Sequence, residues 1–161
     1  MQTLANYFEK GWRISVGICL LSRNRNIFLG ERIDNKGAWQ MPQGGVDVKE
    51  DKSLLSAAKR ELYEETGVKN VKLLKESQNW YYYYLPDYLQ KKLWSGRFVG
   101  QKQKWFAFSF YGEEKEINLN VYKKPEFCQW KWVKPESAIN EIINFKKDIY
   151  KKVLYEFKAL F

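Results

Sequence analysis

The stretch KRELYEETGV, residues 59–68, brings three carboxylates close together and constrains the fold more than any other part of the chain. Its spacing suits a helix, because Glu61, Glu64 and Glu65 then stand at positions i, i+3 and i+4 of one face. Like charges at that spacing each cost on the order of 0.2–0.5 kcal/mol. The folded chain must therefore either leave this face to solvent or place positive charge between the acids.

The segments around this helix predict a mixed sheet with helices on its flanks. Strands are predicted at residues 13–22, 27–32, 71–77, 80–85, 104–111 and 127–133. Helices are predicted at 53–66, with Gly67 as the C-terminal cap, and at 135–143 and 145–161. Residues 35–45 are predicted to form a loop. No repeat or linker divides the chain, so we expect one α/β (α+β) domain over residues 1–161.

The composition excludes several kinds of active site. Histidine is absent from all 161 residues, which excludes Ser-His-Asp and Cys-His catalysis and His-ligated metals. No G-x-x-x-x-G-K-[ST] phosphate loop is present. Cys19 and Cys128 are too few for a disulfide framework, and their apolar surroundings predict buried free thiols. Any catalysis must therefore use carboxylates, Lys, Arg or Tyr, with an oxygen-preferring metal.

The charge balance points to an anionic partner. The 28 Lys and Arg outnumber the 19 Asp and Glu, which favours a nucleotide or nucleic acid, although a generically soluble basic protein would look the same. The apolar runs fall short of the roughly 20 residues that span a membrane. The opening MQTLANYFEKGW lacks the pattern of a signal peptide. We therefore expect a cytoplasmic protein without membrane contact.

The helix belongs to a longer pattern, GGVDVKEDKSLLSAAKRELYEETGV at residues 44–68, which resembles the Nudix box G-x5-E-x7-R-E-U-x-E-E-x-G-U, where U is a bulky aliphatic residue. Residues 60–68 match every fixed position, and Gly44 and Glu50 match the first half. Nine residues, against seven in the pattern, separate Glu50 from Arg60. Lys52 stands in the strict register and has the wrong charge, so either Glu50 or Asp51 is expected to steady the helix and Arg60.

The resemblance implies a Nudix fold, with a mixed sheet between helices, and a hydrolase that depends on divalent metal. Carboxylates on a rigid helix suit Mg²⁺ or Mn²⁺, and two or more ions would neutralise a polyphosphate and lower the pKa of a bound water. Arg60 stands four residues before Glu64 and could orient it by an ion pair. The implied metal ligands are Gly44, Glu61, Glu64 and Glu65. The implied catalytic residues are Glu61, Glu64, Glu65 and Arg60, with Glu61 or Glu65 as general base.

Further strings at residues 11–20, 39–45, 100–106, 125–133 and 145–153 resemble the bacterial RNA pyrophosphohydrolases and the related asymmetric dinucleoside tetraphosphate hydrolases. This resemblance implies that Glu126 also reaches the metals. It implies that Phe145 stacks on a base, where the alternative is plain core packing. The implied contacts to phosphates or the terminal nucleotide are Arg13, Arg32, Gln43, Gln101, Lys102, Lys104 and Lys146. The alternatives are that Arg13 is only an edge charge, that Lys146 is solvated, and that GQKQKWF is only a basic strand start.

The run WYYYYL at residues 80–85 is a second candidate for substrate contact. In a strand, Trp80, Tyr82 and Tyr84 share one face, and Tyr81 and Tyr83 share the other. Aromatic faces stack bases at about 1–3 kcal/mol each. We predict that Tyr82 or Tyr84 faces the substrate, with sheet packing as the alternative.

The favoured function is removal of pyrophosphate from the 5′-triphosphate end of RNA, a step in RNA decay that leaves a 5′-monophosphate. The first alternative is asymmetric hydrolysis of diadenosine tetraphosphate to ATP and AMP. A third hypothesis is a catalytically silent domain that only binds RNA or nucleotide. In each case we expect a monomer without specificity for DNA.

Overall fold

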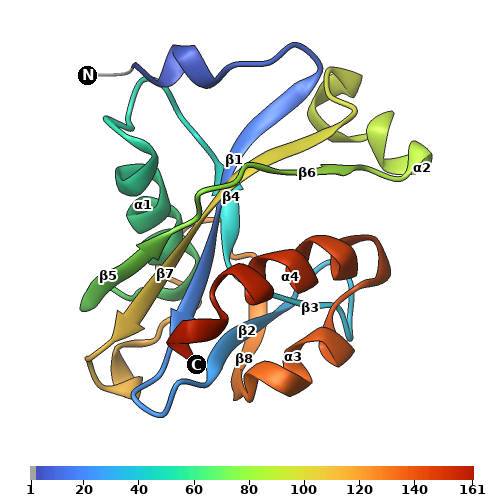
Figure 1. The fold of residues 1–161 in the computed structure, drawn as a ribbon. Helices are drawn as coiled ribbons and strands as arrows, with labels where there is room; N and C mark the ends of the chain where they lie inside the picture. Colours follow the sequence, from blue (N-terminus) through green and yellow to red (C-terminus); the bar gives the residue numbers. More distant parts are fainter. Residues whose placement is uncertain (1–2) are drawn as a thin grey trace.

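The computed structural model describes residues 3–161, so Met1 and Gln2 of the expected domain lie outside the described residues. An eight-stranded mixed sheet has helices on both sides (Figure 1). The strands are β1 (Trp12–Leu21), β2 (Ile27–Arg32), β3 (Trp39–Gln40), β4 (Gln43–Gly45), β5 (Val71–Glu76), β6 (Tyr81–Tyr84), β7 (Gly100–Phe110) and β8 (Phe127–Val133). The α-helices are α1 (Leu54–Thr66), α2 (Asp87–Gln90), α3 (Pro135–Glu141) and α4 (Asn144–Glu156). Short 3-10 turns lie at Leu4–Tyr7, Leu93–Gly96, Glu114–Glu116 and Lys158–Leu160.

Two long parallel strands, β1 and β7, form the centre of the sheet. They pair from Trp12 with Gly100 to Leu21 with Ser109, while the remaining strand pairs are antiparallel. The main order is β3-β2-β1-β7-β5, and β4, β6 and β8 pair with β1, β7 and β2. The expected mixed sheet is confirmed.

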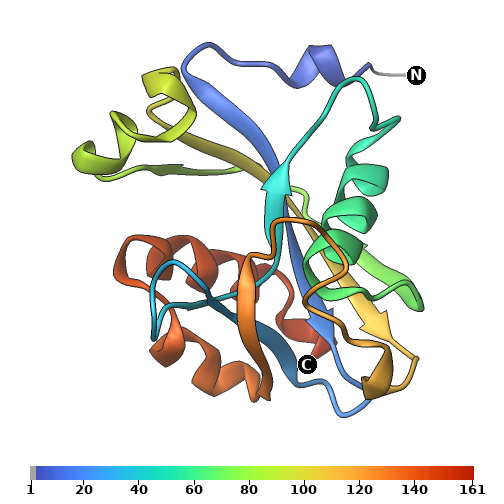
Figure 2. The same cartoon turned by 180° about the vertical axis from the view of Figure 1, so that it is seen from behind.

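Alternating side chains of the central strands form two separate cores. Val16, Ile18 and Leu20 pack with α1 on one side of the sheet. Cys19 and Leu21 pack with α4 on the other side. Figures 1 and 2 show the two helices on opposite sides of β1 and β7. The sheet is thus covered on both faces, as the expected sandwich requires.

Helix α1 has the ends that its sequence predicts. The Ser53 side chain accepts a hydrogen bond from the Ser56 N–H, which caps the first turn. Gly67 has a φ of 74° and donates its N–H to the Tyr63 carbonyl at 2.8 Å. A left-handed residue at this point favours glycine, so the helix stops where the sequence places a residue without Cβ.

Several local expectations were wrong. Residues 35–45 hold the short strands β3 and β4 instead of a continuous loop, because pairing with β2 and β1 orders them. Strand β7 begins at Gly100 and not at Lys104, because β1 supplies partners along its whole length. Cys128 is exposed on β8 and donates its S–H to the Glu31 carboxylate at 3.2 Å. The expected burial of Cys19 is confirmed.

Within residues 3–161, the helices are too short or too polar to cross a membrane.

Candidate active site

The glutamate face of α1 lies directly against β4. A Cβ on Gly44 would collide with the Glu61 carboxylate, so glycine is what allows this close approach. The Gln43 N–H donates to the Glu65 carboxylate at 3.3 Å. Residues 43–45 are held in turn by pairing with Ser15–Gly17 of β1. The sheet therefore fixes where the two carboxylates stand.

Arg60 connects the helix to the preceding loop. Its Nε and Nη2 atoms donate to both Asp51 oxygens at 2.8 and 2.9 Å, and Nη2 also donates to the Gly45 carbonyl at 2.9 Å. Its Nη1 atom donates to Glu61 at 2.9 Å and to Glu64 at 3.3 Å. The hydrogen bonds to Asp51 are the main reason that the pKa of Arg60 is raised. One guanidinium thus orients two of the three helix carboxylates.

The structure distinguishes the two acids that the sequence left open. The Asp51 side chain is 2% exposed, whereas that of Glu50 is 64% exposed and lies 3.9 Å from Arg60. The loop closes on itself, because Asp51 and Asp47 exchange two hydrogen bonds of 2.7 Å. Burial disfavours the ionised form of Asp51, but hydrogen bonds from Arg60 and Asp47 outweigh it and lower the pKa. Asp51 is therefore the acid that steadies Arg60.

Negative charge is concentrated at Glu61 and Glu65. Burial raises the pKa of Glu61 to about 7. Burial, with the nearby charges of Glu61 and Glu126, raises the pKa of Glu65 well above its usual range. Among residues 3–161, no three acidic or cysteine side chains already converge as a metal site, and Arg60 occupies oxygens of Glu61 and Glu64. The carboxylates nevertheless fit a hard divalent cation, because such a cation prefers oxygen ligands and would supply the positive charge that the buried acids lack.

Glu126 contributes to this field from outside the helix. Its carbonyl accepts the Ile33 N–H at 3.0 Å, which ties the exposed loop before β8 to the end of β2. Its charge acts on Glu65, Arg13 and Arg32. The structure thus brings Glu126 to the same site.

A second group of candidates lies on the α4 side of the sheet. Arg32 donates to both Asp34 oxygens at 2.7 and 2.6 Å, and to Gln40 at 3.3 Å. Lys146 donates to the same Gln40 oxygen at 2.8 Å. It is 3% exposed, so the alternative of a solvated lysine is wrong. Burial, with the charge of Arg32, lowers the pKa of Lys146 to about 7.

Phe145 lies beside Lys146 at the start of α4. Its ring centroid is 6.2 Å from that of Tyr83 on β6, and it is only partly buried. It packs against the α4-side core and keeps part of its surface open. Both readings of Phe145, core packing and base stacking, therefore have a structural basis.

A polar chain of side chains crosses the same face of the sheet. Arg13 donates to Gln101 at 3.2 Å, and the Gln101 amide donates to the Tyr83 hydroxyl at 2.7 Å. From the other end, Gln103 donates to Gln43 at 3.4 Å, and Gln43 donates to Tyr83 at 3.3 Å. The predicted residues Arg13, Gln43 and Gln101 are therefore brought together.

The donor and acceptor roles along this series of hydrogen bonds are set by the two residues at its ends. A guanidinium can only donate, and the Trp105 indole, which donates to Gln103 at 3.2 Å, can also only donate. These ends fix which way the glutamine amides point. Two donors then converge on the Tyr83 oxygen, while its own proton meets no acceptor within residues 3–161. Tyr83 is consequently able to donate a hydrogen bond to a ligand.

Four of the expected substrate residues lie on the opposite face of β6 and β7. Lys102 donates to the Tyr7 carbonyl at 2.9 Å, and Lys104 donates to the Gln78 carbonyl at 3.1 Å. Tyr82 donates to Glu9 at 2.7 Å, and the Tyr84 ring packs 4.9 Å from that of Trp12. Strand alternation turns these side chains away from Arg13 and the polar chain. Tyr82 and Tyr84 therefore lie apart from the polar chain, and Tyr83 is the tyrosine of β6 that joins it.

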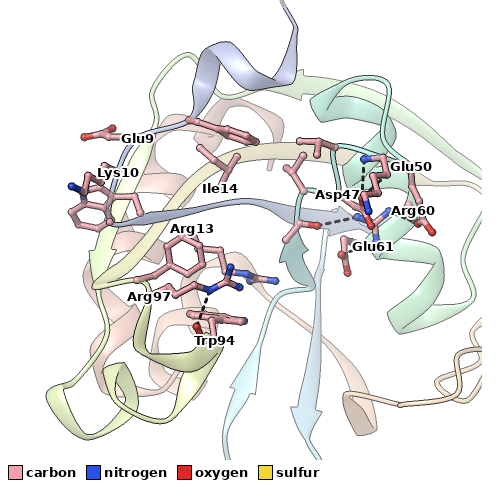
Figure 3. Close-up of a pocket in the computed structure, with 18 of the residues that line it drawn as sticks. Glu9, Lys10, Arg13, Ile14, Asp47, Glu50, Arg60, Glu61, Trp94 and Arg97 are labelled. Carbon is pink, nitrogen blue, oxygen red and sulfur yellow. Dashed lines mark hydrogen bonds and ion pairs between the residues drawn. The ribbon is translucent and has the colours of Figure 1, made fainter.

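The glutamates open onto a cleft of about 1040 Å³ (Figure 3). Arg60 and Glu61 line one side, and Arg13, Trp94 and Arg97 line the other. Glu64 also lines the cleft. Neither Trp94 nor Arg97 was identified from the sequence, because no pattern places the segment 93–98 near α1. Tyr83 could have been found, since it faces Gln101 across the β6–β7 pair.

Comparisons with known proteins agree with this geometry. The NUDIX domain family matches residues 11–154. An RNA pyrophosphohydrolase of Wolbachia pipientis subsp. Culex pipiens is 44% identical over 94% of this chain and 93% of that protein. One from Bartonella tribocorum is 46% identical over 92% of this chain and 91% of that protein.

Solved structures share the fold. The E. coli dihydroneopterin triphosphate pyrophosphohydrolase has a TM-score of 0.68 at 18% identity and covers 89% of this chain and 97% of its own. A C. elegans Ap4A hydrolase binary complex has a TM-score of 0.65 at 18% identity and covers 92% of this chain and 99% of its own. The resemblance carried by residues 44–68 is thereby confirmed, and the chain belongs to the Nudix family.

Proposed function

We propose that this protein is a Nudix hydrolase that removes pyrophosphate from the 5′-triphosphate end of RNA and leaves a 5′-monophosphate. The observation that carries the proposal is one cleft with two kinds of wall. Carboxylates of α1 line one side, and the cationic side chains Arg13 and Arg97 line the other. Relatives at 43–46% identity that carry the name RNA pyrophosphohydrolase support the choice of RNA.

The residues divide the work between holding the phosphates and moving a proton. Arg13, Arg32 and Lys146 would hold phosphate oxygens, because each is a cation whose charge interacts with carboxylates of the acid cluster. Tyr83 would add one neutral donor. Phe145 would stack on a base near the 5′ end.

Nudix hydrolases generally use divalent metals such as Mg²⁺ or Mn²⁺. Two or more ions, held by Glu61, Glu64, Glu65, Glu126 and the Gly44 carbonyl, would neutralise phosphate charge and supply a water of lowered pKa. Glu61 and Glu65 are the two candidates for the general base that takes the proton of the attacking water. Arg60 would keep the carboxylates oriented, through the contacts that it makes with Glu61 and Glu64.

A second substrate is favoured by one observation. The rings of Trp94 and Phe98 lie 6.1 Å apart beside the cleft, away from Phe145. A dinucleoside polyphosphate carries a second base that such rings could stack on, so diadenosine tetraphosphate, cleaved to ATP and AMP, is the alternative. A side-by-side assay of triphosphorylated RNA and diadenosine tetraphosphate, with Mg²⁺ and with Mn²⁺, decides between them.

Glu64→Gln tests whether the protein is an enzyme at all. Loss of this carboxylate should lower kcat by about a thousandfold on the preferred substrate, because it removes a group that stabilises the transition state. Glu76→Gln on the exposed strand β5 is the matched control and should retain full activity. A protein that only binds RNA would show no metal-dependent turnover before the substitution and unchanged affinity after it.

We further propose that residues 1–161 act as one monomeric domain in the cytoplasm. Sedimentation equilibrium of the purified chain measures the oligomeric state, a single cooperative unfolding transition tests the single domain, and fractionation of cells measures the location. A dimer mass would contradict the monomer.

A further inference from the structure

The segment 93–98 forms the side of the cleft that faces the acid helix. Trp94, Arg97 and Phe98 line the cleft together with Glu61 and Glu64 (Figure 3). The turn at Leu93–Gly96 contains no fully buried residue, and Trp94 packs partly buried against the α4-side core. Core packing alone does not account for the contact that its ring makes on the cleft side.

The backbone of this segment is held in a strained conformation. Trp94 and Ser95 have φ values of 49° and 58°, in the left-handed region that side chains with a Cβ disfavour. Arg97 donates to the Trp94 carbonyl at 3.2 Å, and the Phe98 ring contacts the Trp94 ring edge-on. Strain of this kind concentrates at functional sites, where a side chain must be held in one place.

The side chain that the strain positions is the Trp94 ring, and it lies on Arg13. The Arg13 Cζ atom is 4.4 Å from the ring centroid, a cation–π contact visible in Figure 3. On another side, a Cβ on Gly45 would collide with the same guanidinium. Gln101 accepts one N–H at 3.2 Å. The guanidinium is thus bounded by a ring, a glycine and an amide.

Arg13 lines the cleft and, within residues 3–161, has hydrogen-bond donors that remain unused. A guanidinium has five N–H groups, and within residues 3–161 Gln101 is the hydrogen-bond acceptor that Arg13 uses. Burial lowers the pKa of Arg13, so the charge is costly to keep there without an anion. A phosphate oxygen would satisfy both the free donors and the charge.

We infer that Trp94 is a positioning residue, whose ring holds Arg13 in the one orientation that presents its free N–H groups to the polyphosphate of the substrate. The inference rests on the proposed function, because it assigns Arg13 to the phosphates. Trp94 acts through Arg13, so removing the ring should matter only while the arginine is present.

A double-mutant cycle tests this dependence in the full chain. Trp94→Ala should lower kcat/KM for triphosphorylated RNA about tenfold, mainly through KM, because phosphate binding is lost and the carboxylates are untouched. Trp94→Phe should recover most of the loss, since a smaller ring still stacks. In an Arg13→Ala background, Trp94→Ala should change kcat/KM less than about twofold.

A readout without turnover separates this inference from the proposed function. The affinity of the unsubstituted protein for inorganic triphosphate, measured by calorimetry, should fall about tenfold in Trp94→Ala. Tyr155→Ala removes an exposed ring that stacks with Lys158 at 4.1 Å outside the cleft, and it should leave the affinity unchanged. If the unsubstituted protein does not hydrolyse triphosphorylated RNA, the proposed function is wrong, but the role of Trp94 in triphosphate binding is still tested by calorimetry.

Three results would overturn the role of Trp94. The first is an unchanged triphosphate affinity in Trp94→Ala. The second is full additivity of the Trp94 and Arg13 substitutions, which would mean that the ring contacts the substrate independently. The third is a Trp94→Phe protein as impaired as Trp94→Ala, although circular dichroism shows it folded.

Discussion

The two faces of β6 and β7 both carry polar side chains, but those side chains have different hydrogen-bond partners. On the α4 side, Gln101, Gln103 and Tyr83 form a buried polar chain that ends at Arg13. On the other side, Lys102 and Lys104 are tied to backbone carbonyls. The face with lysines has more charge, yet its charges are already occupied. The face with amides ends at Arg13, which has unpartnered N–H groups within residues 3–161 and lines the same cleft as Glu61.

This difference shows that residue type is a poor guide to the phosphate site in a strand. The string GQKQKWF offers lysines and glutamines in strict alternation, and the backbone sends them to opposite faces. The glutamines are connected by hydrogen bonds to Arg13 or, through Gln43, to Tyr83, whereas the lysines are already bound to backbone carbonyls. Arg13 lines the cleft together with Glu61. Glu50 and Asp51 are also neighbours in the chain with different surroundings, because Asp51 is buried against Arg60 and Glu50 is exposed.

Substitution at these two acids sharpens the comparison most. Asp51→Ala should lower the free energy of unfolding by about 3 kcal/mol at pH 7, because it leaves Arg60 without its main partner. Glu50→Ala should change it by less than about 0.5 kcal/mol. Urea unfolding of both variants measures the difference. Equal losses would show that the two acids share the role.

The pH dependence of this effect has a definite sign. The folded pKa of Asp51 lies below its usual 3.8, so its contribution to stability is complete above that value. It is lost as the pH falls through the lower, folded pKa. The gap between the unsubstituted protein and Asp51→Ala should therefore narrow below about pH 4. A gap that widened there would contradict the assigned shift.

Arg13 and Lys102 compare the two faces directly. Arg13→Ala should reduce kcat/KM about 100-fold, because a buried charge-assisted contact to phosphate is removed. Lys102→Ala should stay within about threefold, since its ammonium group already serves Tyr7 and Glu9. Steady-state kinetics on triphosphorylated RNA measures both. A larger loss of kcat/KM in Lys102→Ala than in Arg13→Ala would show that the phosphates bind on the other face of the sheet.

Tyr83 and Tyr82 make the finest test. Tyr83→Phe should reduce kcat/KM about tenfold, because a single neutral hydrogen bond is lost. Tyr82→Phe, on the next residue of the same strand, should have no effect. Tyr81→Phe is a further control, since Tyr81 lies on the same face as Tyr83 but donates to Glu156. Equal values of kcat/KM for all three variants would show that the Tyr83 hydroxyl does not contact the substrate.

The sequence predicts what local rules control. The predicted helix 53–66 is observed at residues 54–66, between the caps Ser53 and Gly67, and 127–133 form a strand with the predicted bounds. The acid face of α1 follows from helical spacing alone. The helix and its acid face need no partner from elsewhere in the chain, so periodicity and caps suffice. The strand 127–133 is predicted from its own residue types, although its partner β2 is distant in the chain.

What the sequence does not predict depends on distant pairing. Strand β4 has only three residues and exists because β1 supplies its partner. The choice of Tyr83 over Tyr82 depends on which face α4 and β4 occupy. Trp94 meets Arg13 although 81 positions separate them, through a turn whose backbone no local preference favours.

The convergence of donors on the Tyr83 oxygen has a consequence for discrimination between RNA ends. Because the Tyr83 oxygen already accepts two hydrogen bonds, its O–H is left to donate, as are the N–H groups of Arg13 that Gln101 does not use. Such donors favour a ligand according to how many acceptors it brings. A 5′-triphosphate end of RNA has the most acceptor oxygens, a 5′-monophosphate end has fewer, and a 5′-hydroxyl end has the fewest. The site would thus bind a 5′-triphosphate end more tightly than the 5′-monophosphate product, and it would bind ends without phosphate least.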